Sequence, residues 1–98
     1  MSTVAVSAPQ SSGYTVYSKN NCPYCTKAKQ LLTTAHIVEC DVFLTVDQKP
    51  AFLQYMDTFT GIQYRTFPMI FHDGVFVGGF TEAKVYYEKQ VCFADEKC

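Results

Sequence analysis

The chain of 98 residues carries 8 Lys and Arg against 9 Asp and Glu, and 48% of its residues are hydrophobic. This composition is globular, and the length fits one domain. There is no basic excess to neutralise phosphates and no apolar run near the roughly 20 residues that span a bilayer. We therefore expect no nucleic-acid partner and no membrane association. Residues 1–13 contain no Lys or Arg, unlike a secretory signal, so we expect a cytoplasmic protein.

The first half of the chain predicts a βαβ unit. Residues 1–12 are small and polar, and we expect a flexible tail ahead of a single domain at 13–98. The β-branched and aromatic run at 14–18 predicts a buried strand. Apolar residues then recur at helical spacing, which predicts a helix at 23–35, and a second strand follows at 37–43.

The second half predicts a helix, a hairpin and a last helix. Asp47 is a candidate N-cap for the second helix, Pro50 fits its first turn, and Gly61 can end it. Two apolar runs flank Asp73-Gly74, which indicates a tight antiparallel hairpin. The predicted order is β-α-β-α-β-β-α, an α/β fold with a four-stranded mixed sheet and flanking helices.

The last helix should begin just after Gly78 and Gly79. Thr81 can act as its cap, and Glu82 in its first turn is favoured by the helix dipole. Its inward face should carry three apolar or aromatic residues, namely Ala83, Tyr86 and Tyr87.

A C-P-Y-C sequence at 22–25 lies at the junction between the first strand and the first helix. A helix N-terminus offers unpaired N–H groups and a positive dipole end, and both favour a thiolate over a thiol. Cys22 should therefore have a lowered pKa, and Lys19 can add positive charge nearby. Cys25, one turn along, can then resolve a mixed disulfide formed on Cys22.

A C-x-x-C pair also begins many zinc sites. The further ligands would have to come from two His and three other Cys, namely His36, His72, Cys40, Cys92 and Cys98. None of these forms a second C-x-x-C or an H-x₃₋₅-H. We therefore favour redox chemistry and expect no metal, with stoichiometric zinc as the observation that would support the structural alternative. Cys40 is expected in the core, and Cys92 and Cys98 as loose terminal thiols.

The chain resembles the dithiol glutaredoxins of the thioredoxin superfamily. The C-P-Y-C at 22–25 matches their active site, and Lys19 precedes it at the family's spacing. The T-F-P at 66–68 is similar to the family's T-V-P, and the G-G-F-T-E at 78–82 to its G-G-C-D-D. The resemblance covers 14–91 and implies a thioredoxin-like fold.

The resemblance also implies a glutathione site. Pro68 should follow a cis peptide bond and face the cysteines, while Phe67 offers its backbone to the peptide. Lys19 should bind the glycyl carboxylate. The backbone amides that begin the last helix should bind the γ-glutamyl carboxylate. The implied glutathione-binding residues are Lys19, Tyr24, Thr66, Phe67, Pro68, Gly79, Phe80 and Thr81. Thr81 departs from the family's usual Asp, and Phe67 from a small β-branched residue.

These features predict a glutathione-dependent reductase of protein disulfides and glutathione mixed disulfides. It would be a monomer without a tightly bound cofactor, and ribonucleotide reductase is one acceptor that the resemblance suggests. A thioredoxin-type reductant is disfavoured because the chain has no Trp and has Pro-Tyr between the cysteines. The alternative is a glutathione-ligated iron–sulfur cluster-binding module, although such relatives mainly have a single active-site Cys followed by Gly.

Overall fold

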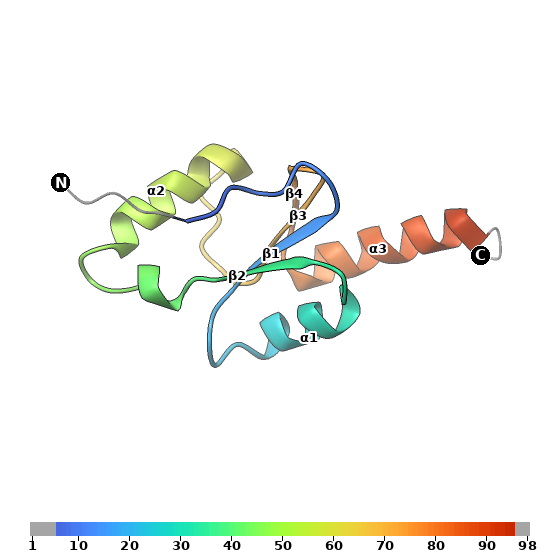
Figure 1. Ribbon diagram of the computed structural model, residues 1–98, viewed down its shortest axis with the longest axis horizontal. Helices are drawn as coiled ribbons and strands as arrows, with labels where there is room; N and C mark the ends of the chain where they lie inside the picture. The colour runs from blue at the N-terminus through green and yellow to red at the C-terminus, as the bar shows by residue number, and fades with distance from the viewer. Residues whose placement is uncertain (1–5, 96–98) are drawn as a thin grey trace.

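A computed structural model describes residues 6–95 of the chain, and its side chains as far as residue 91. Four strands form one mixed sheet in the order β2-β1-β3-β4. Helix α2 covers one face of this sheet, and α1 and α3 cover the other (Figure 1). The predicted order of strands and helices is confirmed, and a 3₁₀ turn is added after β2.

Strand β1 (Tyr14–Ser18) lies in the middle of the sheet, parallel to β2 and antiparallel to β3. Its side chains alternate between the two faces, as the strand period of two requires. Tyr17 packs into the core under α2 with Phe52 and Met56. Val16 packs into the other core with Ala28 of α1. Since both faces are covered, β1 is buried from Thr15 to its end.

Helix α1 (Pro23–Leu31) begins where the sequence predicts but is shorter than the predicted 23–35. Leu32 leaves the helical conformation, and its amide closes the helix on the Ala28 carbonyl at 2.8 Å. Two β-branched residues, Thr33 and Thr34, follow at once. Because such residues lose side-chain freedom in a helix, they are poor candidates to extend it.

Strand β2 (His36–Glu39) is also shorter than the predicted strand at 37–43. The Cys40 amide still donates to the Ser18 carbonyl at 2.8 Å, and Ser18 is the last residue of β1. Beyond this point the chain has no neighbouring strand to pair with. It turns into the short 3₁₀ helix η1 (Asp41–Phe43) instead.

Helix α2 (Lys49–Thr60) confirms Pro50 in its first turn and Gly61 at its end, where Gly61 has φ 77°. The prediction of Asp47 as N-cap is wrong. The cap position is Gln48, which is already in a helical conformation and makes no side-chain cap bond. Thr45 acts at this end instead, since its hydroxyl accepts from the Gln48 amide at 3.3 Å.

Strands β3 (Met69–His72) and β4 (Val75–Gly78) form the predicted hairpin. Its turn residues Asp73 and Gly74 both have positive φ, 52° and 83°. This is the requirement of a type I′ turn, and it confirms the interpretation of Asp-Gly.

Helix α3 (Phe80–Asp95) starts one residue before Thr81, so the prediction of Thr81 as its cap is wrong. The cap position is Gly79, and Thr81 lies inside the first turn. Ala83 is fully buried as predicted, and Tyr87 packs beside it. Tyr86 is 37% exposed, which does not fit the predicted inward position.

The segment before β1 makes specific contacts where the sequence predicts a flexible tail. Val6 is 7% exposed and joins the core under α2. The Tyr55 hydroxyl donates to the Val6 carbonyl at 3.3 Å, and the Tyr17 hydroxyl donates to the Ser7 carbonyl. Residues 1–5 and Cys98 lie outside the described residues, as does the side chain of Cys92.

Candidate functional site

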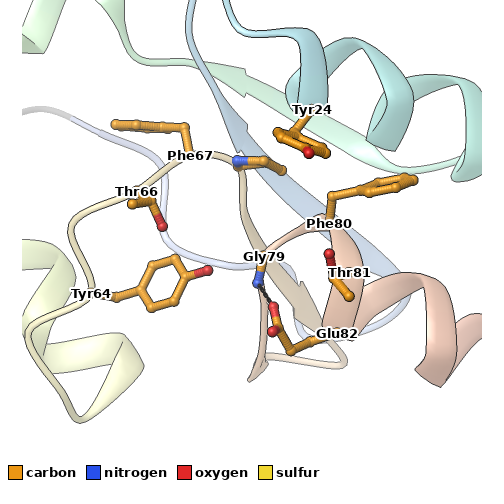
Figure 2. A pocket seen from close by; sticks show the side chains of 9 residues that line it. Tyr24, Tyr64, Thr66, Phe67, Gly79, Phe80, Thr81 and Glu82 are labelled. Carbon is orange, nitrogen blue, oxygen red and sulfur yellow. Dashed lines mark hydrogen bonds between the residues drawn. The ribbon is translucent and has the colours of Figure 1, made fainter.

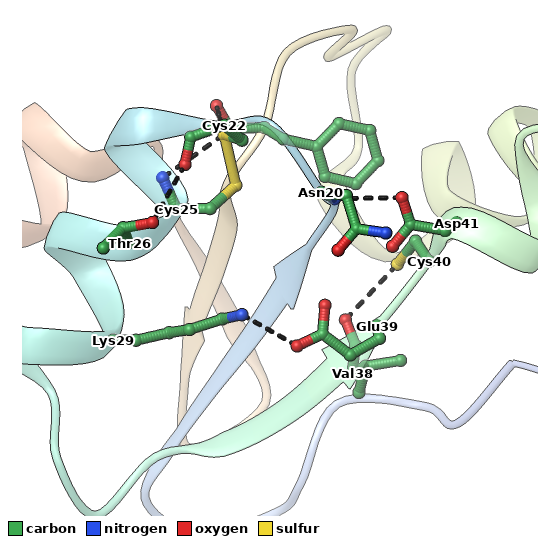
Figure 3. Close-up of a disulfide and its surroundings, with 10 residues drawn as sticks. Asn20, Cys22, Cys25, Thr26, Lys29, Val38, Glu39, Cys40 and Asp41 are labelled. Carbon is green, nitrogen blue, oxygen red and sulfur yellow. Dashed lines mark hydrogen bonds and ion pairs between the residues drawn. A yellow bond between two sulfur atoms is a disulfide. The ribbon is translucent and has the colours of Figure 1, made fainter.

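Cys22 and Cys25 are joined by a disulfide at the N-terminus of α1 (Figure 3). Cys22 is the N-cap residue and is partly exposed, whereas Cys25 is 1% exposed. The Cys25 amide donates to the Cys22 sulfur at 3.2 Å. An accessible sulfur at a helix N-terminus, backed by a buried sulfur one turn later, is the arrangement of a redox-active dithiol.

The loop before β3 brings Phe67 and Pro68 to this disulfide. The Phe67–Pro68 peptide bond is cis, as the resemblance implied. The Phe67 carbonyl lies 3.7 Å from the Cys22 sulfur. The backbone of this loop therefore faces the more accessible of the two sulfurs. Lys19 lies on the same side, with its ammonium 5.6 Å from the centre of the Phe67 ring.

A pocket of about 410 Å³ opens beside Pro68 (Figure 2). We call it the site pocket. It contains every residue that the resemblance assigned to glutathione except Lys19, and it adds Tyr64 and Glu82. Its lining residues are Tyr24, Tyr64, Thr66, Phe67, Pro68, Gly79, Phe80, Thr81 and Glu82.

Aromatic side chains form one wall of the site pocket (Figure 2). The ring of Tyr24, which is 55% exposed, lies 6.0 Å from that of Phe80. The ammonium of Lys27 lies 5.1 Å from the Tyr24 ring centre. Cations are attracted to the face of an aromatic ring at this distance. Tyr24, which directly precedes Cys25 in the sequence, thus contacts both a cation and a second ring.

Glu82 changes what the start of α3 can offer a ligand. Its carboxylate accepts a hydrogen bond from the Gly79 amide at 2.9 Å (Figure 2). This is the glutamate half of a capping box, in which the N3 side chain satisfies the N-cap amide. The Gly79 amide, predicted to bind a carboxylate, is therefore already paired within the protein. The sequence signal for this contact is a glutamate three residues after Gly79, and the prediction of Thr81 as the cap concealed it.

Tyr64 is a pocket residue that the sequence did not single out. Its side chain reaches toward Gly79, and a Cβ added at Gly79 would collide with the Tyr64 hydroxyl. The ring packs edge-on against Phe76 of β4, with centroids 5.0 Å apart. Tyr64 and Gly79 are separated in the sequence by β3 and β4, so no local pattern indicated their contact.

Cys40 is a core thiol, as predicted. It is fully buried at the end of β2, and its thiol donates to the Val38 carbonyl at 3.5 Å. Burial raises its pKa to about 12. Because the thiolate is the reactive species, a thiol held protonated in this way is inert in the folded protein.

Two kinds of feature are absent from the described residues. Over residues 6–91, no three His, Cys, Asp or Glu side chains gather in a group able to hold a metal ion. No helix in the described part of the chain is both long enough and apolar enough to cross a membrane.

The region of this chain that resembles known proteins contains most of the residues of the site. A family profile described as Glutaredoxin matches residues 14–77, which include the cysteine pair and the cis-proline loop. The chain belongs to the glutaredoxin family. It is 40% identical over 68 residues to a curated glutaredoxin of Neisseria meningitidis serogroup A, covering 69% of this chain and 76% of that protein.

Solved glutaredoxins share the fold. Glutaredoxin 1 from Francisella tularensis, complexed with cacodylate, superposes with a TM-score of 0.68 at 29% identity, over 81% of this chain and 95% of the other. A buckwheat glutaredoxin–glutathione complex gives a TM-score of 0.63 at 25% identity, over 83% and 73%. The predicted thioredoxin-like fold is confirmed. With its cysteine pair, the chain is a thiol–disulfide oxidoreductase of this family.

Proposed function

We propose that this protein uses glutathione to reduce protein disulfides and glutathione mixed disulfides through Cys22 and Cys25. The observation that carries the proposal is the position of Cys22. Its sulfur is accessible at a helix N-terminus, joined to a buried partner, and lies 3.7 Å from the carbonyl beside the cis-proline bond.

Cys22 acts as the nucleophile. In the reduced protein the N-terminus of α1 and the amide of Cys25 favour its thiolate. The thiolate attacks one sulfur of a substrate disulfide, the substrate S–S bond breaks, and the leaving sulfur takes a proton from solvent. When the attacked sulfur belongs to glutathione, the product is a Cys22–glutathione disulfide and a free protein thiol. A second glutathione then releases oxidised glutathione and restores Cys22.

Cys25 acts as the resolving thiol when the substrate is a protein disulfide. Its attack on the Cys22 sulfur breaks the mixed disulfide, frees the substrate thiol and forms the Cys22–Cys25 disulfide. Two molecules of glutathione then supply the two electrons that reopen it. The 1% exposure of Cys25 supports this division, since external disulfides reach Cys22 more easily.

The site pocket supports glutathione as the partner. It joins the cis-proline loop, where Phe67 has backbone groups for an added extended peptide, to the first turn of α3. The Phe80 and Thr81 amides can bind one carboxylate of glutathione. Lys19 lies by Phe67 at the other end and can meet the second carboxylate. The solved buckwheat relative is a glutathione complex.

The direct test is turnover of a glutathionylated peptide with glutathione, coupled to glutathione reductase and NADPH. We expect oxidation of NADPH that depends on both glutathione and the protein. If reduction instead requires a thioredoxin reductase and ignores glutathione, the proposed electron donor is wrong.

A further inference from the structure

Ser18 carries a buried hydroxyl that makes no hydrogen bond. It is the last residue of β1 and is fully buried. Among the described side chains, its oxygen is the buried polar atom left without a hydrogen-bond partner. Such groups are costly, because the hydroxyl loses its bonds to water and gains nothing in return. An orphaned hydroxyl in a protein interior therefore calls for a physical reason.

Topology places this hydroxyl at the same end of the sheet as the cysteine pair. Ser18 lies two residues after Val16, so both side chains point to the face that α1 covers. Because β1 and β2 are parallel, α1 runs back against β1. The end of β1 therefore meets the start of α1. Val16 packs with Ala28, and Cys25 is buried one turn before Ala28.

In the disulfide form the Cys25 sulfur is tied to that of Cys22, and no sulfur makes a hydrogen bond with the Ser18 hydroxyl. The structure holds the Cys22–Cys25 disulfide, whose sulfurs carry no charge and are weak acceptors. Reduction turns Cys25 into a thiol or a thiolate, and a charged acceptor makes much stronger hydrogen bonds. On reduction the Cys25 sulfur is freed from Cys22 and can turn toward the Ser18 hydroxyl on the same face of the sheet, which would give the hydroxyl a partner.

We propose that Ser18 is a positioning residue for Cys25, whose sulfur accepts a hydrogen bond from the Ser18 hydroxyl in the reduced protein. The bond favours the Cys25 thiolate, which must attack the Cys22 sulfur to break a mixed disulfide and form the Cys22–Cys25 disulfide. It also stabilises the dithiol relative to the disulfide. This role goes beyond the proposed function, because it concerns the cysteine pair whatever the electron donor.

The test is the reduction potential of the cysteine pair, measured in a dithiothreitol redox buffer so that glutathione plays no part. Ser18→Ala removes the hydroxyl. We expect its dithiol–disulfide equilibrium to move about tenfold toward the disulfide, a potential about 30 mV more negative. Ser18→Thr keeps a hydroxyl and should recover most of the shift.

A matched control lies on the same strand. Thr15 is also fully buried, but it lies on the opposite face of β1, and its hydroxyl accepts from the Gln10 amide at 2.9 Å. Thr15→Val should leave the potential unchanged. A Ser18→Ala potential equal to that of the wild type, or a shift matched by Thr15→Val, would overturn the proposal.

Thermal unfolding separates this role from a structural one. Ser18→Ala should destabilise the reduced protein relative to the wild type and leave the disulfide form as stable or more stable, because the orphaned hydroxyl is gone. Equal losses of Tm in both redox states would show that Ser18 only packs, and the proposal would fail.

Discussion

The Gly79 amide donates a hydrogen bond of 2.9 Å to the Glu82 carboxylate at the edge of the site pocket. A carboxylate of the protein thus accepts the hydrogen bond of an amide that was expected to bind a carboxylate of glutathione. The amides of Phe80, Thr81 and Glu82 precede the first intrahelical hydrogen bond of α3, which the Ala83 amide makes. Any anionic ligand that also uses Gly79 must first displace Glu82.

Replacing Glu82 with glutamine should therefore strengthen ligand binding. Glu82→Gln keeps an oxygen acceptor but removes the negative charge that opposes an incoming carboxylate. We expect KM for a glutathionylated peptide to fall about two- to fivefold with kcat unchanged, in the range of a helix-terminus charge effect of roughly 0.3–1 kcal/mol. A higher KM would mean instead that Glu82 attracts the ammonium group of the ligand.

Gly79 should tolerate no side chain while Tyr64 keeps its hydroxyl. A Cβ at Gly79 would meet this hydroxyl and the Glu82 carboxylate. We expect Gly79→Ala to raise KM for the glutathionylated peptide at least fivefold, because the displaced Tyr64 side chain narrows the site pocket. Steady-state kinetics of Gly79→Ala and of Gly79→Ala with Tyr64→Phe test this, since loss of the hydroxyl should restore much of the affinity. An equal defect in both variants would contradict the steric account.

Cys40 should make the disulfide form less stable at alkaline pH. Its pKa is about 12 in the folded protein and about 8.5 in an unfolded chain. A raised folded pKa means that its stabilising effect is present below pH about 8.5 and is lost as pH rises toward 12. Denaturant unfolding from pH 8.5 to 10 should show a free energy of unfolding that falls more steeply in the wild type than in Cys40→Ala, by up to about 1.4 kcal/mol per pH unit.

Alkylation gives an independent check on Cys40. Iodoacetamide should modify Cys40 in the native disulfide form only at the rate of unfolding, and at once in denaturant. Rapid modification of Cys40 in the native protein, located by peptide mass mapping, would show that the thiol is neither buried nor protonated.

The elements that the sequence predicted well are those with local causes. Asp73-Gly74 specifies its turn through two positive φ angles, and Gly61 ends α2 for the same reason. Some of the differences from the prediction arise where a distant partner decides. The second predicted strand stops early because β1 ends at Ser18 and leaves nothing to pair with. Val6 is buried because its side chain packs into the core under α2, where Tyr55 and Tyr17 also donate hydrogen bonds to its segment.

The residues of the candidate site also fall into those that a local motif predicts and those that depend on distant contacts. Its motifs at 22–25, 66–68 and 78–82 could be recognised because each is a short continuous sequence. Tyr64 could not, since its position depends on packing against Phe76 and on the missing side chain at Gly79. Glu82 was noticed for the helix dipole, but its bond to Gly79 depends on where α3 begins.

The most direct test of the account compares Cys22→Ser and Cys25→Ser on two substrates, a glutathionylated peptide and a protein disulfide, both with glutathione. We predict that Cys22→Ser abolishes turnover of both. Cys25→Ser should keep the reaction with the glutathionylated peptide and lose most of that with the protein disulfide. Turnover that survives in Cys22→Ser but disappears in Cys25→Ser would contradict the assigned roles.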